Sequence, residues 1–529
     1  MLLRRNAFRW GLFLFFFITE LALGFYISYI VGYMHSDALS RVANAFYVLY
    51  SRDPHLGAIG FVWNPLPSLM ELGVLVLYPI LPELASYGLA GVLVTSVFAG
   101  LTALLLYDAG RRNGLSFGMS LGLSLLYCLN PFVFLFGANG LSDAPYIYFL
   151  MYTVIRFGDW LKTRQISHLV LAGFALALAF WTRYEAVPFG VSLGAALLIV
   201  LLLMPPGEGE KPLPWVERAR KVEATSVILL LPAVFSGLLW IFFNYIIMGD
   251  ALYFLHSEYS NQAQSDALKG DENFNRIFNS PLLALVFVAK KTAWFSVPLA
   301  AVLLIRTFAG RLLRWETLVL VCLFLSIPGL QFALLMKESS FGWFRYFMYV
   351  YPITIAWIPY ELGLLRKRRA AFTVVAAGLL TTSALLSYAV TNPQIAPDEN
   401  TFLTIKSGNK YYQSQILDRS VAKWLDEHMG DATILTDSAS AFTILVNSRN
   451  TKKFLITSDY DFKKAKNDPP GNGVDYILIP RPLPNADKSA INTKYKDLYE
   501  KGNEWAELYH DFDNEWRLYK IKKWQPPAT

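Results

Sequence analysis

Residues 10–31 read WGLFLFFFITELALGFYISYIV and follow three arginines, Arg4, Arg5 and Arg9. A transmembrane helix needs about 20 mostly apolar residues, whereas the apolar core of a cleaved signal peptide has roughly 7–15. This run is long enough for a membrane span and too long for a signal peptide. We therefore expect an uncleaved transmembrane helix here.

Ten further apolar runs of similar length follow, which predicts a polytopic α-helical membrane protein with about 11 transmembrane helices. The predicted spans cover residues 10–32, 85–107, 115–136, 143–161, 166–183, 186–204, 225–248, 282–305, 316–336, 344–364 and 370–390. One more apolar stretch, 65–82, is ambiguous because it is short and contains four prolines.

The composition divides the chain into two parts. Only 16% of all residues are charged, against roughly 25% in soluble domains, which argues against a soluble enzyme or a disordered protein. Residues 392–529 hold 19 Lys and Arg and 19 Asp and Glu, so the net charge of +7 belongs to residues 1–391. We predict a transmembrane domain over 1–391 and a soluble domain over 392–529, and no nucleic-acid partner.

The soluble part alternates between helical and β-type patterns. Residues 419–429 have helical spacing, and the short runs 432–436, 453–457 and 474–480 favour strands. Two last runs, 506–510 and 516–521, are typical of a hairpin. The pattern predicts a small α/β domain with a partly parallel sheet.

Positive charge in the loops predicts the topology. If 65–82 does not cross, 18 Lys and Arg of the membrane part fall on the cytoplasmic side and 7 on the outer side. We therefore expect a cytoplasmic N-terminus, an extracytoplasmic C-terminal domain, and a re-entrant or juxtamembrane helix at 65–82. The outer loops 33–84 and 249–281 are then long, and long loops in compact folds are usually functional.

Two acids lie at the predicted outer ends of spans. Asp37, just after the first span, is placed to accept a proton from a hydroxyl nucleophile. Its alternative role is a helix cap, and Arg41 would share its helix face. Asp143, in the run NGLSDAP at 139–145, is a second candidate, for which capping by Ser142 or Asp143 itself is the structural alternative.

Two arginines are candidates for binding a phosphate. Arg183 ends an otherwise uncharged helix in the run TRYE at 182–185, where it could instead pair with Glu185 or a lipid headgroup. Arg345 precedes Tyr346 in the run GWFRYFMYVYP at 342–352, and an arginine inside an aromatic span requires an anion.

Lys290 and Lys291 lie about eight residues inside a predicted span. At least one is expected to face a polar cavity, and the alternative is a structural ion pair with Glu20 of the first span. His256 and Glu258, in a polar and aromatic outer stretch, are candidates for an acid or a metal ligand. A lone histidine is more often structural, so we predict no metal site.

Carboxylates and cations thus gather near one membrane face, without a cysteine cluster, a phosphate-binding glycine loop or a Ser/His/Asp arrangement. This combination suits a sugar linked to a polyprenyl phosphate. The lipid tail would remain in the bilayer, Arg or Lys would bind the phosphate, and a carboxylate would activate the acceptor hydroxyl. The expected partners are this lipid donor, the membrane, and a glycan, lipid or protein acceptor, with no cofactor.

Several short motifs resemble the GT-C superfamily of membrane glycosyltransferases, especially the protein O-mannosyltransferases and the aminoarabinose transferase. They are the acid at Asp37, WNPLPS at 63–68, GLSD at 140–143, TRYE at 182–185, GDALYF at 249–254, and RY at 345–346 with YP at 351–352. The resemblance implies an inverting transfer with Asp37 as general base. The chain departs from many relatives in having Ala38 after Asp37 and no Asp-x-Asp, so a metal requirement is not indicated.

Two other functions remain open at this point. A transporter or flippase for lipid-linked sugars would also have many spans and buried lysines, although such proteins often contain a repeat that we do not find here. A non-catalytic partner in envelope assembly would use the C-terminal domain as a binding surface. Transfer without net lipid translocation would separate the enzyme from the flippase.

Overall fold

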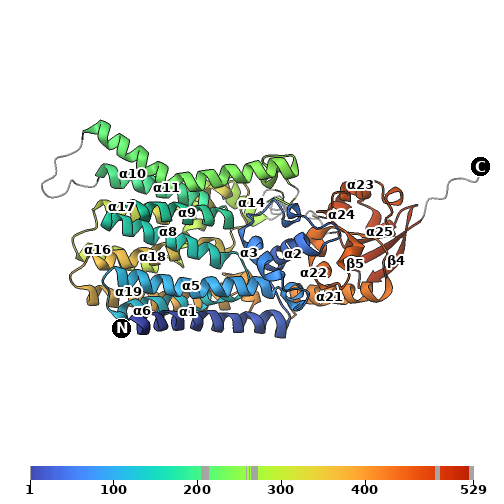
Figure 1. The fold of residues 1–529 in the computed structure, drawn as a ribbon, viewed down its shortest axis with the longest axis horizontal. Coiled ribbons are helices and arrows are strands. Elements are labelled where there is room, and N and C mark those ends of the chain that lie inside the picture. The colour runs from blue at the N-terminus through green and yellow to red at the C-terminus, as the bar shows by residue number, and fades with distance from the viewer. Residues whose placement is uncertain are drawn as a thin grey trace, which may run out of the picture.

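The computed structural model describes residues 2–203, 214–257, 259–260, 263, 272–406, 408–482 and 489–522. Long helices run side by side over most of its length, and a mixed helix and strand region lies at one end (Figure 1). The N-terminus lies at the opposite end of the helical bundle.

The bundle helices have residue bounds similar to those of the predicted spans. They are α1 (Leu2–Phe25) with the π-helical turn η1 (Tyr26–Val31), α5 (Leu89–Arg112), α6 (Phe117–Cys128), α7 (Pro131–Ala138), α8 (Asp143–Thr163), α9 (Ile166–Thr182), α10 (Ala186–Leu203), α11 (Trp215–Phe243) with η3 (Asn244–Met248), α15 (Pro281–Ala293), α16 (Val297–Phe308), α17 (Trp315–Met336), α18 (Val350–Gly363) and α19 (Arg368–Thr391).

Six helices in the described residues are long and apolar enough to cross a membrane, and eight if each of two bent pairs counts as one span. The bends are 70° between α6 and α7 and 81° between α15 and α16. In both pairs the second helix has a proline, Pro131 or Pro298, in its first turn, where the missing N–H is harmless. A multi-pass helical fold is therefore confirmed, and the count of eleven stays a prediction.

The short helices gather at the end next to the C-terminal region (Figure 1). They include α2 (Ser36–Tyr50), η2 (Leu56–Ile59), α3 (Leu66–Leu75), α4 (Glu83–Ser86), α12 (Tyr253–His256), α14 (Glu272–Phe278), η5 (Phe344–Phe347) and α20 (Pro397–Thr401). The ambiguous stretch 65–82 forms only α3 and a series of turns, and α3 packs against α2. It is too short to span a bilayer.

Cations assigned to the cytoplasmic loops meet at the other end of the bundle, around the N-terminus. These contacts join Arg9 to Asp108 at 2.7 Å, Arg112 to Asp159 at 3.4 Å, Lys162 to Asn113 at 2.7 Å, and Arg368 to the Gly114 carbonyl at 2.8 Å. The N-terminus and the C-terminal region thus lie at opposite ends of the helices. The side of the membrane on which each lies stays a prediction.

The C-terminal region contains a five-stranded mixed sheet. Its strands are β1 (Ile434–Leu435), β2 (Phe454–Leu455), β3 (Tyr476–Pro480), β4 (Ala506–Phe512) and β5 (Trp516–Ile521), in the order β2-β1-β3-β5-β4. β1 is parallel to β2 and β3, and β5 is antiparallel to β3 and β4. Four of these strands lie within the runs that predicted them, and β4 extends two residues beyond the run 506–510. The helices are α21 (Lys410–His428), α22 (Ser438–Asn447), α23 (Phe462–Asn467), α24 (Ala490–Lys494) and α25 (Leu498–Lys501).

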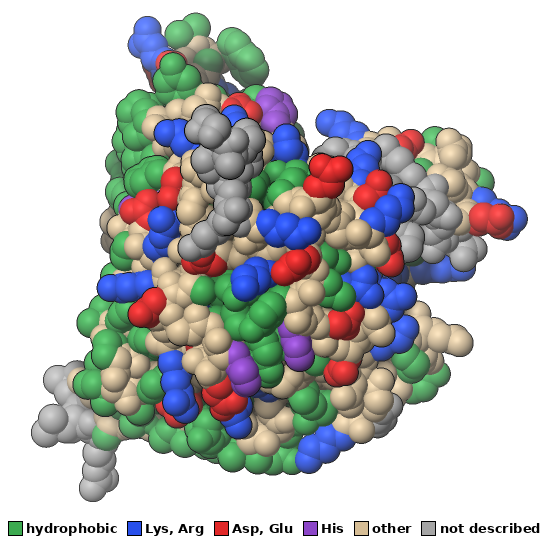
Figure 2. All heavy atoms as spheres, turned by 90° about the vertical axis from the view of Figure 1, so that its right-hand side faces the viewer, with side chains coloured by type: hydrophobic (Ala, Val, Ile, Leu, Met, Phe, Trp, Pro, Cys, Tyr) green, Lys and Arg blue, Asp and Glu red, His purple; other side chains and the backbone are tan. Residues whose placement is uncertain are grey.

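The C-terminal region packs directly on the bundle. Buried residues of α21 and α22, such as Val421, Leu425 and Ile444, belong to the same apolar core as the bundle helices. A second, smaller core around Leu455 and Ile477 belongs to this region alone. Its outer end carries acidic and basic side chains interspersed, as a water-exposed surface does (Figure 2). The C-terminal region therefore shares a packed apolar interface with the helical bundle, in addition to the chain connection between them.

A buried ion-pair network joins three helices at the N-terminal end of the bundle. Arg306 of α16 is fully buried and donates to Glu361 of α18 through Nη2 at 2.8 Å and Nε at 3.1 Å. Its Nη1 also donates to Thr317 of α17 at 2.8 Å. Loss of Arg306 would leave Glu361 with the longer contact to Arg311, at 3.9 Å, and breaking a buried ion pair typically costs about 3–5 kcal/mol.

We therefore predict that Arg306→Met strongly destabilises the protein. The unfolding temperature in detergent should fall clearly below that of the wild type, by an amount matching about 3–5 kcal/mol. The control Arg314→Met removes an exposed arginine at the same end of the bundle and should leave the unfolding temperature nearly unchanged. Equal effects of the two substitutions would contradict the importance of the network.

Candidate functional site

The loop after the first span places Asp37 at the start of a helix. The first span ends at Gly32, whose φ of +86° suits glycine, and α2 begins four residues later. His35 caps α2, because its Nδ1 accepts a hydrogen bond from the Asp37 N–H at 3.2 Å. The alternative that Asp37 itself is the cap is therefore wrong, and its carboxylate is left for other contacts.

That carboxylate forms an ion pair with Arg345 of η5. Arg345 Nη2 lies 2.5 Å from Asp37 Oδ2. The Arg345 side chain is only 3% exposed, whereas that of Asp37 is 31% exposed. Arg345 Nε has no hydrogen-bond partner among the described residues. Arg345 thus holds Asp37 and keeps a free donor, while Asp37 remains accessible.

The same contact controls the ionisation of Asp37. Burial alone would raise the pKa of this carboxyl group, but the Arg345 guanidinium outweighs it, aided by His35 and Arg41. The pKa of Asp37 is therefore held below its ordinary value. Asp37 is a carboxylate at any physiological pH.

A second cluster forms around Arg183, which follows α9 directly. Arg183 Nη2 lies 2.7 Å from Glu185, and its Nη1 contacts Asp143 at 3.4 Å and the Ser142 hydroxyl at 3.2 Å. Asp143 is fully buried and accepts a hydrogen bond from Tyr349 at 2.5 Å. Neither Ser142 nor Asp143 makes a side-chain cap at the start of α8, so the capping alternative is wrong for this pair.

Tyr346 joins the two clusters. The Arg345 guanidinium carbon lies 5.7 Å from its ring centroid, and that of Arg183 lies 6.0 Å from it. Both distances are in the range of cation–π interactions, in which the ring face attracts the guanidinium charge. The structure thus brings together Asp37, Arg345, Tyr346, Arg183, Asp143 and Glu185, all of which the sequence analysis selected from distant segments.

Arg41 lies beside this cluster and differs from the expectation. It is buried, but it donates to the Asn64 carbonyl at 3.2 Å and stacks over Trp63 at 4.9 Å, and the ion pair of Asp37 is with Arg345. Asn64 in turn donates to the Phe180 carbonyl at 2.6 Å, near the end of α9. The motif WNPLPS therefore ties the first loop to the segment that carries Arg183.

The two lysines of α15, Lys290 and Lys291, lie in different environments. Lys291 Nζ donates to the Gly342 carbonyl at 2.6 Å, three residues before Arg345, whereas Lys290 is exposed. In the described part of the chain neither lysine forms an ion pair within 4.0 Å. Glu20, the alternative partner, is buried in α1 and lines a small cavity with Cys128 and Gly137. The proposed Glu20 ion pair is therefore wrong.

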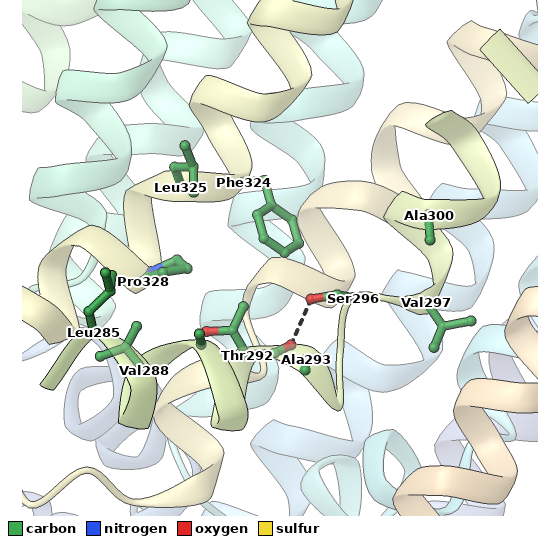
Figure 3. A pocket seen from close by; sticks show the side chains of 11 residues that line it. Leu285, Val288, Thr292, Ala293, Ser296, Val297, Ala300, Phe324, Leu325 and Pro328 are labelled. Atoms are coloured by element: carbon green, nitrogen blue, oxygen red, sulfur yellow. Dashed lines mark hydrogen bonds between the residues drawn. The ribbon is translucent and has the colours of Figure 1, made fainter. Parts of the chain in front are cut away.

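An apolar groove is lined by residues of α15 on both sides of Lys291 in the chain, among them Ala289 and Thr292, while Lys291 itself is not part of the lining. It has a volume of about 510 Å³ and lies where α15 and α16 bend against α17 (Figure 3). Phe324, Leu325 and Pro328 line it from α17, and Thr292 and Ser296 are among its few polar groups. Ser296 Oγ donates to the Thr292 carbonyl at 2.7 Å, so that hydroxyl is already satisfied. The lining suits a hydrocarbon chain.

The two remaining candidates do not join the cluster. His256 is exposed and pairs with Asp250, its Nδ1 lying 2.9 Å from the Asp250 carboxylate. Glu258 lies outside the described residues. His, Cys, Asp and Glu side chains in the described part do not group in threes as a metal site would need. The expectation that no metal is required stays a prediction.

Sequence reasoning missed one acid at the edge of the site, Glu399 of α20. It is 1% exposed, and neither of its carboxyl oxygens has a hydrogen-bond partner among the described residues. Burial and repulsion by Asp398 raise its pKa from 4.5 to about 7, although Arg345 and Lys291 act in the opposite direction. No sequence pattern marks it, because it lies between the last span and α21. Tyr349 was also missed, although it follows Arg345 and Tyr346 in one aromatic run.

Comparison with known families agrees with this site. Residues 83–219 match the model of the family described as dolichyl-phosphate-mannose-protein mannosyltransferase. The matched segment is about a quarter of the chain and contains Asp143, Arg183 and Glu185. The match confirms the resemblance to lipid-dependent membrane glycosyltransferases that the short motifs predicted.

Two further comparisons add little. The curated proteins contain no match to the chain. Among solved structures, the archaeal oligosaccharyltransferase AglB from Archaeoglobus fulgidus, in complex with an inhibitory peptide and a dolichol-phosphate, has 10% sequence identity and a TM-score of 0.42. The alignment covers 99% of this chain and 75% of that chain. This is a weak likeness.

The raised pKa of Glu399 predicts a pH dependence of stability. A folded state that binds this proton more tightly than the unfolded chain loses stability as pH rises from about 4.5 through about 7. Glu399→Gln should therefore gain stability relative to the wild type at pH 8 but not at pH 4.5, by on the order of 3 kcal/mol. Unfolding temperatures in detergent across this pH range measure the effect.

The control for this experiment is Glu504→Gln, which changes an exposed glutamate of the C-terminal region. Its unfolding temperature should follow that of the wild type at every pH. A Glu399→Gln variant whose curve also parallels the wild type would show that Glu399 is not buried as described.

Proposed function

We propose that the protein is a membrane glycosyltransferase that moves a sugar from a polyprenyl-phosphate donor to an acceptor hydroxyl. The observation that carries this proposal is the accessible Asp37 carboxylate, held 2.5 Å from buried Arg345. Lys291, which makes no ion pair within 4.0 Å in the described part of the chain, donates to Gly342 near Arg345, and an apolar groove runs along the same helix. The family match supports the same class of donor. A base, a phosphate-binding cation and a place for a lipid chain are what this reaction requires.

Asp37 acts as the general base in this proposal. Its carboxylate takes the proton of the acceptor hydroxyl as that oxygen attacks the anomeric carbon, and the bond from that carbon to the lipid-phosphate oxygen breaks. The lipid phosphate leaves with the electron pair, and the configuration inverts in a single displacement. The low pKa that Arg345 imposes keeps Asp37 ionised before the acceptor arrives. As the phosphate takes up part of the charge of Arg345, the carboxylate becomes a stronger base.

Lys291 and Arg345 bind the donor phosphate. In the described part of the chain, Lys291 donates to a carbonyl and lies 5.0 Å from the Phe287 ring centroid but makes no ion pair, and Arg345 keeps a free Nε, whereas Arg183 is occupied by Glu185 and Asp143. The polyprenyl chain then extends from Lys291 into the groove between α15, α16 and α17. Arg183, Tyr346 and Asp143 line the side on which the sugar lies. Positive charge at the phosphate stabilises the leaving group as negative charge develops there.

The acceptor, a glycan, lipid or protein, approaches from the end of the bundle that carries the C-terminal region. We place this end outside the cytoplasm, with the N-terminus inside. The support is the set of loop cations at the opposite end, whose excess follows the positive-inside rule.

Asp37→Asn is predicted to abolish transfer. Loss of a general base lowers kcat by about 10²–10⁴, and the KM for the donor should change by much less, although Asp37 also pairs with Arg345. Transfer from a synthetic polyprenyl-phosphate sugar by the purified protein measures both constants. Asp53→Asn, in the same outer segment but outside the cluster, is the matched control and should be fully active. Full activity of Asp37→Asn would disprove the assignment of the base.

Lys291→Met is predicted to weaken binding of polyprenyl phosphate. The loss of one charge-assisted contact costs about 1.5–3 kcal/mol, or roughly 10- to 100-fold in the inhibition constant of polyprenyl phosphate. Lys290→Met on the same helix is the matched control, because Lys290 is exposed and should change this constant by less than about threefold. If Lys291→Met and Lys290→Met changed the inhibition constant equally, Lys291 would not be the residue that binds the phosphate.

A further inference from the structure

The loop that leads to Asp37 is held along its whole length by the segment after the last span. Arg419 of α21 donates to the Gly32 carbonyl at 2.7 Å. The Tyr33 hydroxyl lies 3.4 Å from that of Thr401, and the Tyr33 ring packs on Phe402. The structure therefore joins residues 32–35 to residues 401–419.

The firmest of these contacts is made by Gln415 of α21. Its Oε1 accepts a hydrogen bond from the Met34 N–H at 3.1 Å, and its Nε2 donates to the Met34 carbonyl at 2.5 Å. One side-chain amide thus satisfies both backbone groups of a single residue, as a neighbouring strand would. Gln415 is only 6% exposed, so water does not compete for these bonds.

The Met34 side chain is enclosed from the opposite side. It packs against Gly88, before α5, and against Gly140 of the GLSD run. A Cβ at Gly140 would clash with the Met34 Cε, and both glycines have a positive φ, so these positions suit glycine. Met34 is therefore fixed through its side chain by the bundle and through its backbone by Gln415.

We propose that Gln415 is a positioning residue for Asp37, and that the C-terminal region thereby completes the active site. The proposal rests on the function proposed above. Only His35 and Ser36 separate Met34 from Asp37, and His35 caps α2 through the Asp37 N–H. A shift of the Met34 backbone moves the first turn of α2, and with it the carboxylate that faces Arg345.

This role gives the C-terminal region a part in the chemistry without a contact to the substrate. A displacement of about 1 Å at a reacting group can cost around 100-fold in rate. Among the residues that the structure describes, the Gln415 side chain hydrogen-bonds to Met34, and it does not line the groove. Its loss should therefore lower kcat and leave donor binding unchanged.

The test compares Gln415→Ala with Gln413→Ala, an exposed glutamine on the same helix. We expect kcat to fall at least about tenfold in Gln415→Ala, with the inhibition constant of polyprenyl phosphate within threefold of the wild type. Gln413→Ala should match the wild type in both. The conservative variant Gln415→Glu keeps the acceptor for the Met34 N–H and should recover part of the lost rate.

Two further readouts separate positioning from general damage. In an Asp37→Asn background, Gln415→Ala should cause no additional loss of residual transfer, since both act through one carboxylate. Hydrogen exchange in peptides covering residues 32–38 should quicken in Gln415→Ala, while that of residues 40–48 stays unchanged. This exchange measurement does not depend on activity.

The outcomes distinguish this inference from the proposed function. If Asp37→Asn is inactive but Gln415→Ala transfers at the wild-type rate, the positioning role is wrong and the function stands. If Asp37→Asn is fully active, the base is wrong. If hydrogen exchange of residues 32–38 is the same in Gln415→Ala as in the wild type, the two Gln415 hydrogen bonds do not fix the Met34 backbone, whatever the activity.

Discussion

The ion pair between Asp37 and Arg345 is the contact on which the arrangement of this site depends. It joins the start of α2, just after the first span, to the segment before α18, which lies 308 residues further along the chain. Because Arg345 is buried, its charge requires a close anion, and Asp37 supplies it. The pair therefore fixes α2 relative to η5 and at the same time keeps the carboxylate ionised.

The rest of the site is organised around this pair by two kinds of support. From the bundle, the Asp143–Arg183–Glu185 cluster contacts the pair through the Tyr346 ring. Lys291 donates a hydrogen bond to the Gly342 carbonyl, in the segment that precedes Arg345. From the C-terminal region, Gln415 and Arg419 hold the backbone before Asp37. The proposed catalytic carboxylate, in the first turn of α2, depends on such support, because precision at a reacting group comes from the residues around it.

Sequence patterns predict the elements of this fold well. Apolar runs of about 20 residues have little alternative to helices in a bilayer, and the alternating runs of the C-terminal region match the strands of its sheet. The sequence predicted most of the residues that make up the site, but not which of them form ion pairs with one another. Helical spacing favoured Arg41 as the partner of Asp37, whereas the partner is Arg345, which no local pattern could connect to it.

Choices between neighbouring residues also depended on packing that the sequence does not show. Lys290 and Lys291 are equivalent in sequence, yet only Lys291 reaches Gly342, because successive residues of a helix point about 100° apart. Glu399 and Gln415 belong to a segment that reads as the start of a soluble domain. Their roles arise only because this segment folds back onto the first loop.

The most direct test of the account is a structure of the protein with polyprenyl phosphate bound. We expect the phosphate to lie within hydrogen-bond distance of Lys291 Nζ and Arg345 Nε, with the chain in the groove between α15, α16 and α17 and with Asp37 open toward the acceptor side. A phosphate bound at the N-terminal end of the bundle, or a lipid chain in another groove with Asp37 remote from it, would contradict the account.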